Sequence, residues 1–165
     1  MTNDDGLLVS RRDSGRPKLS PPYCELGIAM STCRDALLIG FHRDRPVGVD
    51  LEAESALDID EIDRMARDHF TAREAAAIAA APRGAKSAMF LCRWTAKEAA
   101  LKVTGRGVYD GLGWPSIDMV AAPHGFEIAH VEVPASVHAG RLHIGVRRIS
   151  LTSAGTAWAA LCVAA

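Results

Sequence analysis

The sequence predicts an α+β fold, because segments with strand character lie at both ends of the chain and helical segments lie between them. The chain has 165 residues, of which 48% are hydrophobic and 24% charged, which suffices for one domain with its own core. An α/β fold would alternate strands and helices along the chain, whereas here the two kinds are separated. We therefore expect antiparallel sheets with helices packed against them.

The first third of the chain is expected to be a loop followed by three strands. Residues 1–22 are polar and are interrupted by Gly15, Pro17 and two further prolines, which predicts an extended arm. Three short apolar runs follow, and polar turns separate them, which favours antiparallel pairing between neighbours. These three predicted strands are residues 25–30, 36–41 and 47–52.

The middle of the chain is expected to be helical. Apolar side chains recur at helical spacing over residues 58–81, and Thr71 followed by Glu74 forms a capping box that starts a second helix within this stretch. Residues 86–104 are rich in good helix formers and poor in β-branched residues, which makes this segment the strongest helix candidate. Gly105-Arg106-Gly107 is expected to end it.

Strand patterns return after residue 108. Three runs, residues 126–133, 142–151 and 158–164, fit a β-meander, with turns at Pro123-His124-Gly125 and Ala139-Gly140.

Composition excludes several classes of function. A net charge of −1 and an aromatic content of 5% argue against nucleic-acid binding. No apolar run approaches the roughly 20 residues that span a membrane, and the start of the chain does not resemble a signal peptide, so we expect a cytoplasmic protein. The four cysteines lack the CxxC spacing of a zinc site. Basic residues cluster before residue 46, which suits a small anionic ligand.

Two acidic residues are expected on one face of the third strand. In the run VGVDLE, side chains alternate between faces, so Asp50 and Glu52 project to the same side. Two neighbouring carboxylates repel each other, and a hard divalent cation such as Mg²⁺ relieves that repulsion while also holding phosphates. Alternatively, the two acids are a solvated strand face, which a D-x-E pattern alone does not distinguish.

The long helix adds a second group of chemically useful residues. Trp94, Glu98 and Lys102 are spaced four apart and therefore share a face. Glu98 is a candidate third carboxylate, and Lys102 is a candidate phosphate contact one turn further on. The alternative is an exposed Glu98–Lys102 ion pair, which would stabilise the helix by only about 0.3–0.5 kcal/mol.

These motifs together resemble the paired signature of the 4'-phosphopantetheinyl transferase superfamily. GVDLE matches the pattern G-[IV]-D-x-E, and WTAKEAALK matches [FW]-x-x-K-E-x-x-x-K. Phe70–Glu74 resembles the family's F-[ST]-x-x-E segment, Gly15-Arg16-Pro17 its G-[KR]-P element, and the final TAWAALCVAA its last strand. Ser31-Thr32-Cys33 stands where the family usually has Ser-His-[ST]. Thr32 therefore occupies the position at which the family has a histidine. The resemblance covers about residues 14–165.

The resemblance implies a Mg²⁺-dependent enzyme that transfers phosphopantetheine from coenzyme A to a serine of an apo acyl or peptidyl carrier protein and releases 3',5'-ADP. Asp50, Glu52 and Glu98 would bind the metal, and Glu98 would also be a candidate base. Lys102 would neutralise phosphate charge, and Lys97 would be an ionic or structural neighbour in the coenzyme site. The remaining coenzyme contacts would be Arg16, Ser31 and Thr32.

The resemblance also implies a layout. The chain groups with the larger, surfactin-synthetase-activating type, whose fold has two halves related by a pseudo-twofold axis. Residues 1–13 would be a flexible arm, 14–47 a partial first half and 48–165 a complete second half of a single domain. A monomer and a homodimer both remain open. A catalytically weakened binder of coenzyme A or of the carrier, and another Mg²⁺-dependent phosphotransfer or hydrolysis enzyme, are the alternative functions.

Overall fold

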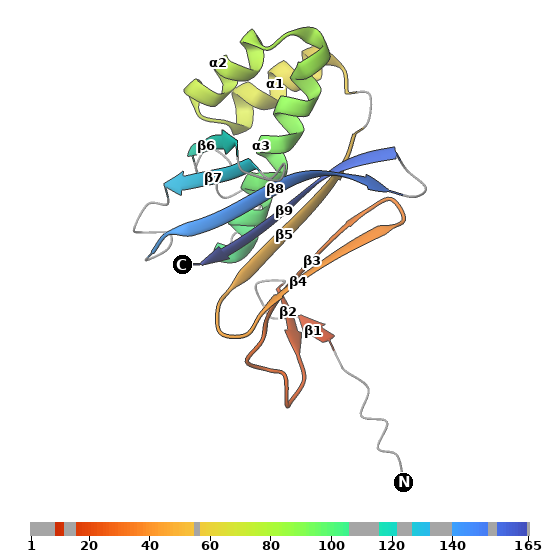
Figure 1. Cartoon of the computed structure of the whole chain (residues 1–165), viewed down its shortest axis with the longest axis vertical. Coiled ribbons are helices and arrows are strands. Elements are labelled where there is room, and N and C mark those ends of the chain that lie inside the picture. Colours follow the sequence, from red (N-terminus) through yellow and green to blue (C-terminus); the bar gives the residue numbers. More distant parts are fainter. Residues whose placement is uncertain are drawn as a thin grey trace.

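The computed structural model of the chain describes residues 9–11, 16–54, 57–105, 116–121, 127–132, 140–151 and 155–164. The three helices gather at one end and one face of a sheet, and a small strand pair lies at the opposite end, near the N-terminus (Figure 1). The fold is α+β, as the sequence predicts. None of the helices in the described residues is long and apolar enough to cross a membrane.

The main sheet has five antiparallel strands in the order β5-β9-β8-β7-β6. Its strands are β5 (Val47–Ala53), β6 (Ser116–Ala121), β7 (Glu127–Glu132), β8 (Leu142–Leu151) and β9 (Gly155–Ala164). The predicted meander is confirmed as β7-β8-β9, although β6 was not predicted. Of the two predicted turns, Pro123-His124-Gly125 lies outside the described residues, and so does Ala139 of the other.

Helix α3 (Arg83–Thr104) packs against one face of this sheet and forms the main core with β8 and β9. Residues of α3 such as Ala96, Ala99 and Ala100 are fully buried, which brings the helix close to the strands. One close approach is at Gly48 of β5, where a Cβ atom would stand 2.0 Å from the backbone oxygen of Ala99. The glycine therefore lets β5 lie directly against the helix that carries Glu98.

Helices α1 (Ile59–His69) and α2 (Ala72–Ala80) cap the upper end of α3, as Figure 1 shows. The predicted capping box is confirmed, because the Thr71 side chain accepts from the Glu74 backbone and the Glu74 side chain accepts from Thr71 N–H. α3 begins at Arg83, earlier than predicted, and ends before Gly105, whose φ of 76° is the left-handed conformation expected at a helix end.

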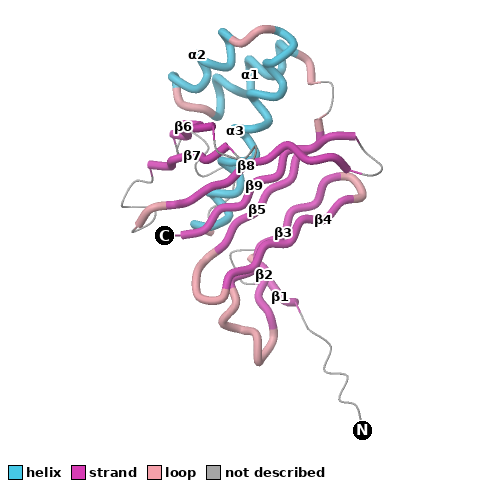
Figure 2. The backbone as a smooth tube through the Cα atoms, viewed as in Figure 1, coloured by secondary structure: helices cyan, strands magenta, loops and turns pink. Residues whose placement is uncertain are grey.

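The three predicted N-terminal strands exist, but their pairing differs from expectation. β3 (Gly27–Cys33) and β4 (Ala36–His42) form an antiparallel hairpin, whereas β5 pairs with β9 and not with β4. β3 instead contacts β5 through its side chains. The backbone N–H of Leu51 donates a hydrogen bond to Ser31 Oγ (3.2 Å). Figure 2 shows this hairpin beside β5. The polar turn between β4 and β5 therefore did not lead these two strands to pair with each other.

Part of the segment predicted to be an extended arm forms a small strand pair. β1 (Val9–Arg11) and β2 (Pro17–Leu19) are antiparallel, with Val9 opposite Leu19. Leu19 is buried, which explains why this polar segment is held against the rest of the chain.

Candidate active site at the junction of β5 and α3

Asp50 is the centre of the candidate site. The residue is 4% exposed, and its Oδ1 accepts hydrogen bonds from Ser31 Oγ (2.9 Å) and Lys102 Nζ (2.7 Å). Lys102 Nζ also donates to the backbone oxygen of Val49 at 3.0 Å, so the ammonium is fixed at the edge of β5. The second carboxylate oxygen, Asp50 Oδ2, is buried and has no hydrogen-bond partner. A buried charged oxygen without a partner is costly, and a cation bound there would offset that cost.

The negative charge of Asp50 shifts the pKa values of both Glu98 and Glu52. Burial and the charge of Asp50 raise the pKa of Glu98 to about 7, with Glu52 adding to the effect and Lys102 opposing it. Burial and Asp50 also raise the pKa of Glu52, while the charge of Lys102 and a hydrogen bond from the Trp94 side chain oppose that shift. The acids that the sequence placed on two separate elements therefore share one region of negative potential.

The donor set fits a hard divalent cation, although the side chains do not form a closed cage. Within the described residues, no group of three or more histidine, cysteine or acidic side chains is arranged to hold a metal ion. The three acids supply only oxygen donors, which Mg²⁺ prefers, and Asp50 Oδ2 is an unused one. A cation would also offset the repulsion that raises the pKa values of Glu52 and Glu98.

Ser31 and Thr32 point to opposite faces of the hairpin, although they are adjacent in sequence. Ser31 binds Asp50 and so belongs to the site. Thr32 is exposed and lies opposite Leu37 in the β3–β4 register, on the outer face of the hairpin. The structure therefore brings Ser31 to the acids and does not bring Thr32 there.

Lys97 also points away from the acids. Its side chain is fully buried, its Nζ lies 2.8 Å from Glu74 Oε2, and its ammonium lies 4.7 Å from the centre of the Phe70 ring. Neighbouring residues on a helix are rotated by about 100° from each other, so Lys97 faces α2 while Glu98 faces β5. In this structure Lys97 forms a buried ion pair with Glu74, and its contact with the coenzyme stays a prediction.

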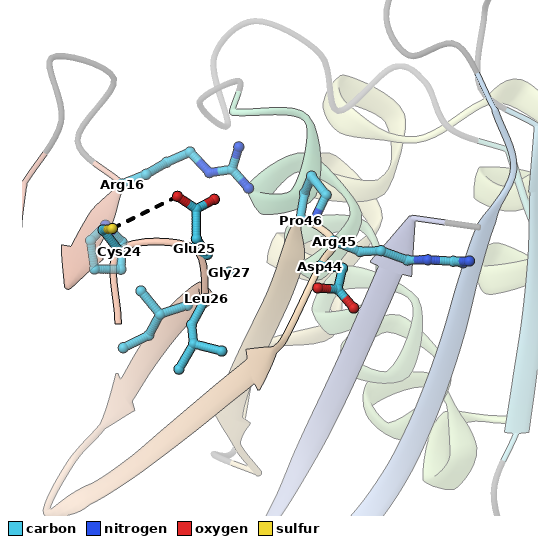
Figure 3. A pocket seen from close by; sticks show the side chains of 10 residues that line it. Arg16, Cys24, Glu25, Leu26, Gly27, Asp44, Arg45 and Pro46 are labelled. Carbon is cyan, nitrogen blue, oxygen red and sulfur yellow. Dashed lines mark hydrogen bonds between the residues drawn. The ribbon is translucent and has the colours of Figure 1, made fainter. Parts of the chain in front are cut away.

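Arg16 lies at the C-terminal end of α3, beside a pocket of about 220 Å³. A Cβ at the cap residue Gly105 would stand 3.5 Å from Arg16 Cδ. Lys102 and Gly105 are three residues apart and therefore lie near one face of the helix end. Figure 3 shows Arg16 and Glu25 on one side of the pocket, with Arg45 and Pro46 opposite.

Sequence reasoning missed two partners of the acidic residues. The hydrogen bond from Ser31 to Asp50 links strands that share no backbone ladder, so no pattern within either strand indicates it. The hydrogen bond between Trp94 and Glu52 explains the tryptophan of the helical motif, and the four-residue spacing from Trp94 to Glu98 was its only signal.

Comparison with known proteins gives the site its context. No curated protein is similar enough to match the chain. A solved structure described as "Chronobacterium ammoiniagenes apo-ACPS structure" aligns over 73% of this chain and 96% of that chain, with 17% identity and a TM-score of 0.39. Residues 46–159 match the family model ACPS, the 4'-phosphopantetheinyl transferase superfamily. This match covers more than half of the chain and includes Asp50, Glu52, Glu98 and Lys102, so the chain belongs to the 4'-phosphopantetheinyl transferase superfamily.

Proposed function

We propose that this protein transfers 4'-phosphopantetheine from coenzyme A to a serine hydroxyl of an apo acyl or peptidyl carrier protein, in a Mg²⁺-dependent reaction. The observation that carries the proposal is the buried Asp50, whose unpartnered Oδ2 lies in the same negative region as Glu52 and Glu98. Membership of the superfamily supports the general transfer, and the site residues support its details.

The three acids would hold the metal ion, and a bound Mg²⁺ would neutralise charge on the diphosphate of the coenzyme. Ser31 holds Asp50 in place from β3, and the backbone of β5 fixes Lys102. The Lys102 side chain is 32% exposed, so its ammonium can also face a phosphate at the surface of the site. Arg16 would contact the nucleotide end of the coenzyme beyond the end of α3. Thr32, on the outer face of the hairpin, would be reached only by a ligand that extends around the hairpin edge.

The reaction forms one P–O bond and breaks another. The serine oxygen of the carrier attacks the β-phosphorus of coenzyme A, and the bond from that phosphorus to the bridging oxygen breaks, releasing 3',5'-ADP. The serine proton passes to Glu98, directly or through a water molecule, and Lys102 stabilises the charge that develops on the phosphate. The protein supplies position and neutralisation, which are the main requirements of phosphoryl transfer.

Mass spectrometry of candidate carrier proteins tests the proposal. The protein is incubated with coenzyme A, Mg²⁺ and a panel of apo fatty-acid, polyketide and nonribosomal-peptide carriers. At least one carrier should gain the mass of one phosphopantetheine group. Glu98→Gln should slow that gain by about 10²–10⁴-fold, the usual contribution of a general base. Glu61→Gln, at an exposed position of α1, is the matched control and should keep the wild-type rate.

A second experiment separates transfer from binding alone. Calorimetric titration with coenzyme A measures binding independently of any carrier. Binding without mass gain on any carrier would favour a catalytically weakened relative that holds coenzyme A or the carrier. If the protein neither binds coenzyme A nor modifies any carrier, the proposed function is rejected.

A further inference from the structure

The outer face of the β3–β4 hairpin carries large apolar side chains in contact with water. Leu37, Ile39 and Phe41 are 56%, 49% and 72% exposed, and they alternate along β4. The register places Ile28, Met30 and Thr32 of β3 beside them on the same face. We call these six residues the outer hairpin face. It carries no charged side chain, and contiguous exposed apolar surface of this kind marks an interaction site.

The inner face of the same hairpin is already used within the chain. Gly40 of β4 packs so tightly that a Cβ there would stand 2.4 Å from Val49 Cγ1. Ala29, Val47 and Val49 form a small buried cluster, and Leu38 packs against it. Burial of the inner face therefore fixes the alternation that exposes Leu37, Ile39 and Phe41, and no rotation of the strand can hide both sets.

The far edge of β4 is also unused by the described strands, since β3 and β4 form a sheet of two strands. A two-residue turn, Arg34-Asp35, closes this hairpin between Cys33 and Ala36. In such a hairpin the closing pair exchanges hydrogen bonds and the pairs then alternate. The backbone groups of Leu37, Ile39 and Phe41 therefore point away from β3, along an edge that is suited to pairing with another strand.

We propose that a second copy of this chain pairs its β4 antiparallel with this β4, about a twofold axis at Ile39. The sequence around Ile39 is complementary to itself under that rotation. Leu37 would lie opposite Phe41 of the partner subunit, and Ile39 would meet Ile39 of the partner subunit. Further out, Asp35 would lie opposite Arg43 of the partner subunit. All these positions follow from antiparallel pairing centred on one residue.

Charge makes a second copy a better occupant than an unrelated protein. Arg34, Asp35, Arg43 and Asp44 are all exposed. Rotation about Ile39 brings Asp35 toward Arg43 and Arg34 toward Asp44, so opposite signs meet at both ends of the pairing. Each exposed pair adds at most about 1 kcal/mol, but together they select the antiparallel register. The new backbone ladder and the cross-strand contacts of the apolar residues between these charges supply the association. The dimer is independent of the proposed transferase activity.

Analytical ultracentrifugation tests the dimer. The wild-type protein should sediment as a dimer, and Ile39→Arg, which brings two like charges together on the axis, should sediment as a monomer. Asp35→Arg and Arg43→Asp should each weaken the dimer about three- to tenfold, and the double exchange should restore it. Within one chain these two residues are at opposite ends of β4, about 26 Å apart at the usual rise per residue, so the rescue requires two copies.

A cysteine placed on the axis gives a second, geometric test. Ile39→Cys should form a disulfide-linked dimer on mild oxidation, because directly paired residues have Cα atoms about 5.5 Å apart. Thr32→Cys is the matched control, since two intervening strands would separate it from its counterpart and it should not crosslink. A wild-type monomer, a trimer, or a dimer that Ile39→Arg leaves unchanged would overturn the proposal.

Discussion

Individual residues decide how closely β5 and α3 approach. Gly48 lies two residues before Asp50 and faces the helix, where its lack of a side chain leaves room for the backbone of Ala99. The acids of β5 and Glu98 of α3 can share one ligand only if these two elements remain in contact. A side-chain atom at position 48 is therefore expected to affect the site, although Gly48 touches no substrate.

Gly48→Ala should destabilise the protein and reduce transfer together. The added Cβ would meet backbone atoms, which cannot move without shifting α3, and overpacking of this kind costs about 1–3 kcal/mol. Gly84→Ala in the first turn of α3 is the matched control, because nothing lies within 4 Å of its added Cβ. Urea denaturation should show a loss for Gly48→Ala and no loss for Gly84→Ala. Equal stabilities would contradict the close packing.

Cys162 should be inert to alkylating reagents in the folded protein. Burial raises the pKa of this thiol to about 12, so almost no thiolate is present up to pH 9. Cys24 is partly exposed and should react under the same conditions. Peptide mapping after brief treatment with iodoacetamide measures both, and denaturant should make Cys162 reactive. Rapid native labelling of Cys162 would show that β9 opens readily.

At the scale of elements, Glu74 joins three parts of the fold. It caps α2 through Thr71, pairs with Lys97 of α3, and accepts the N–H of Ile117 in β6 through Oε1 (2.9 Å). Glu74 is 4% exposed and Lys97 is fully buried, so each charge depends on the other. Lys97 therefore faces Glu74, while the neighbouring Glu98 lies within reach of the charge of Asp50 in β5.

Glu74→Gln should destabilise the protein by about 3–5 kcal/mol, because it leaves the buried Lys97 charge without a counter-charge. Combining it with Lys97→Met should recover part of that loss, which double-mutant analysis of urea unfolding would quantify. Glu61→Gln breaks an exposed pair with Arg64 and should cost at most about 1 kcal/mol.

Lys97→Met alone distinguishes a structural role of Lys97, in the buried ion pair, from a role in binding coenzyme A. Lys97→Met should lower stability while the folded protein keeps its affinity for coenzyme A. Full stability with weakened coenzyme binding would instead support the contact implied by the family resemblance.

At the scale of the whole molecule, the site joins segments that are far apart along the chain. Asp50 and Glu52 come from β5, Glu98 and Lys102 from α3, and Ser31 from a hairpin outside the main sheet. A ligand held by all three elements binds the folded state and not the unfolded chain. Its binding free energy is therefore added to the stability of the fold.

Mg²⁺ and coenzyme A together should raise the melting temperature. A concentration 100-fold above the dissociation constant corresponds to about 2.7 kcal/mol of added stability. Asp50→Asn should remove this increment, whereas Asp60→Asn on the exposed side of α1 should retain it. Differential scanning calorimetry with and without EDTA measures the effect. An unchanged increment in Asp50→Asn would remove Asp50 from the binding site.

The sequence by itself determined the helices and most of the strands, and it indicated which residues the candidate site contains. The capping box at Thr71, the glycine that ends α3 and the strand character of β5 depend on interactions within a few residues, so the local pattern predicts them. The paired motifs likewise indicated the acids and the lysine, and the family match includes them.

Only the tertiary structure decided which of these residues meet. It paired β5 with β9 instead of β4, turned Lys97 into the core, set Thr32 on the outer hairpin face, and left Asp50 Oδ2 without a partner. The physical reason is that these outcomes depend on the free energy of packing between segments distant in sequence. Adjacent residues can therefore have opposite surroundings, as Ser31 and Thr32 do, and no local pattern records the difference.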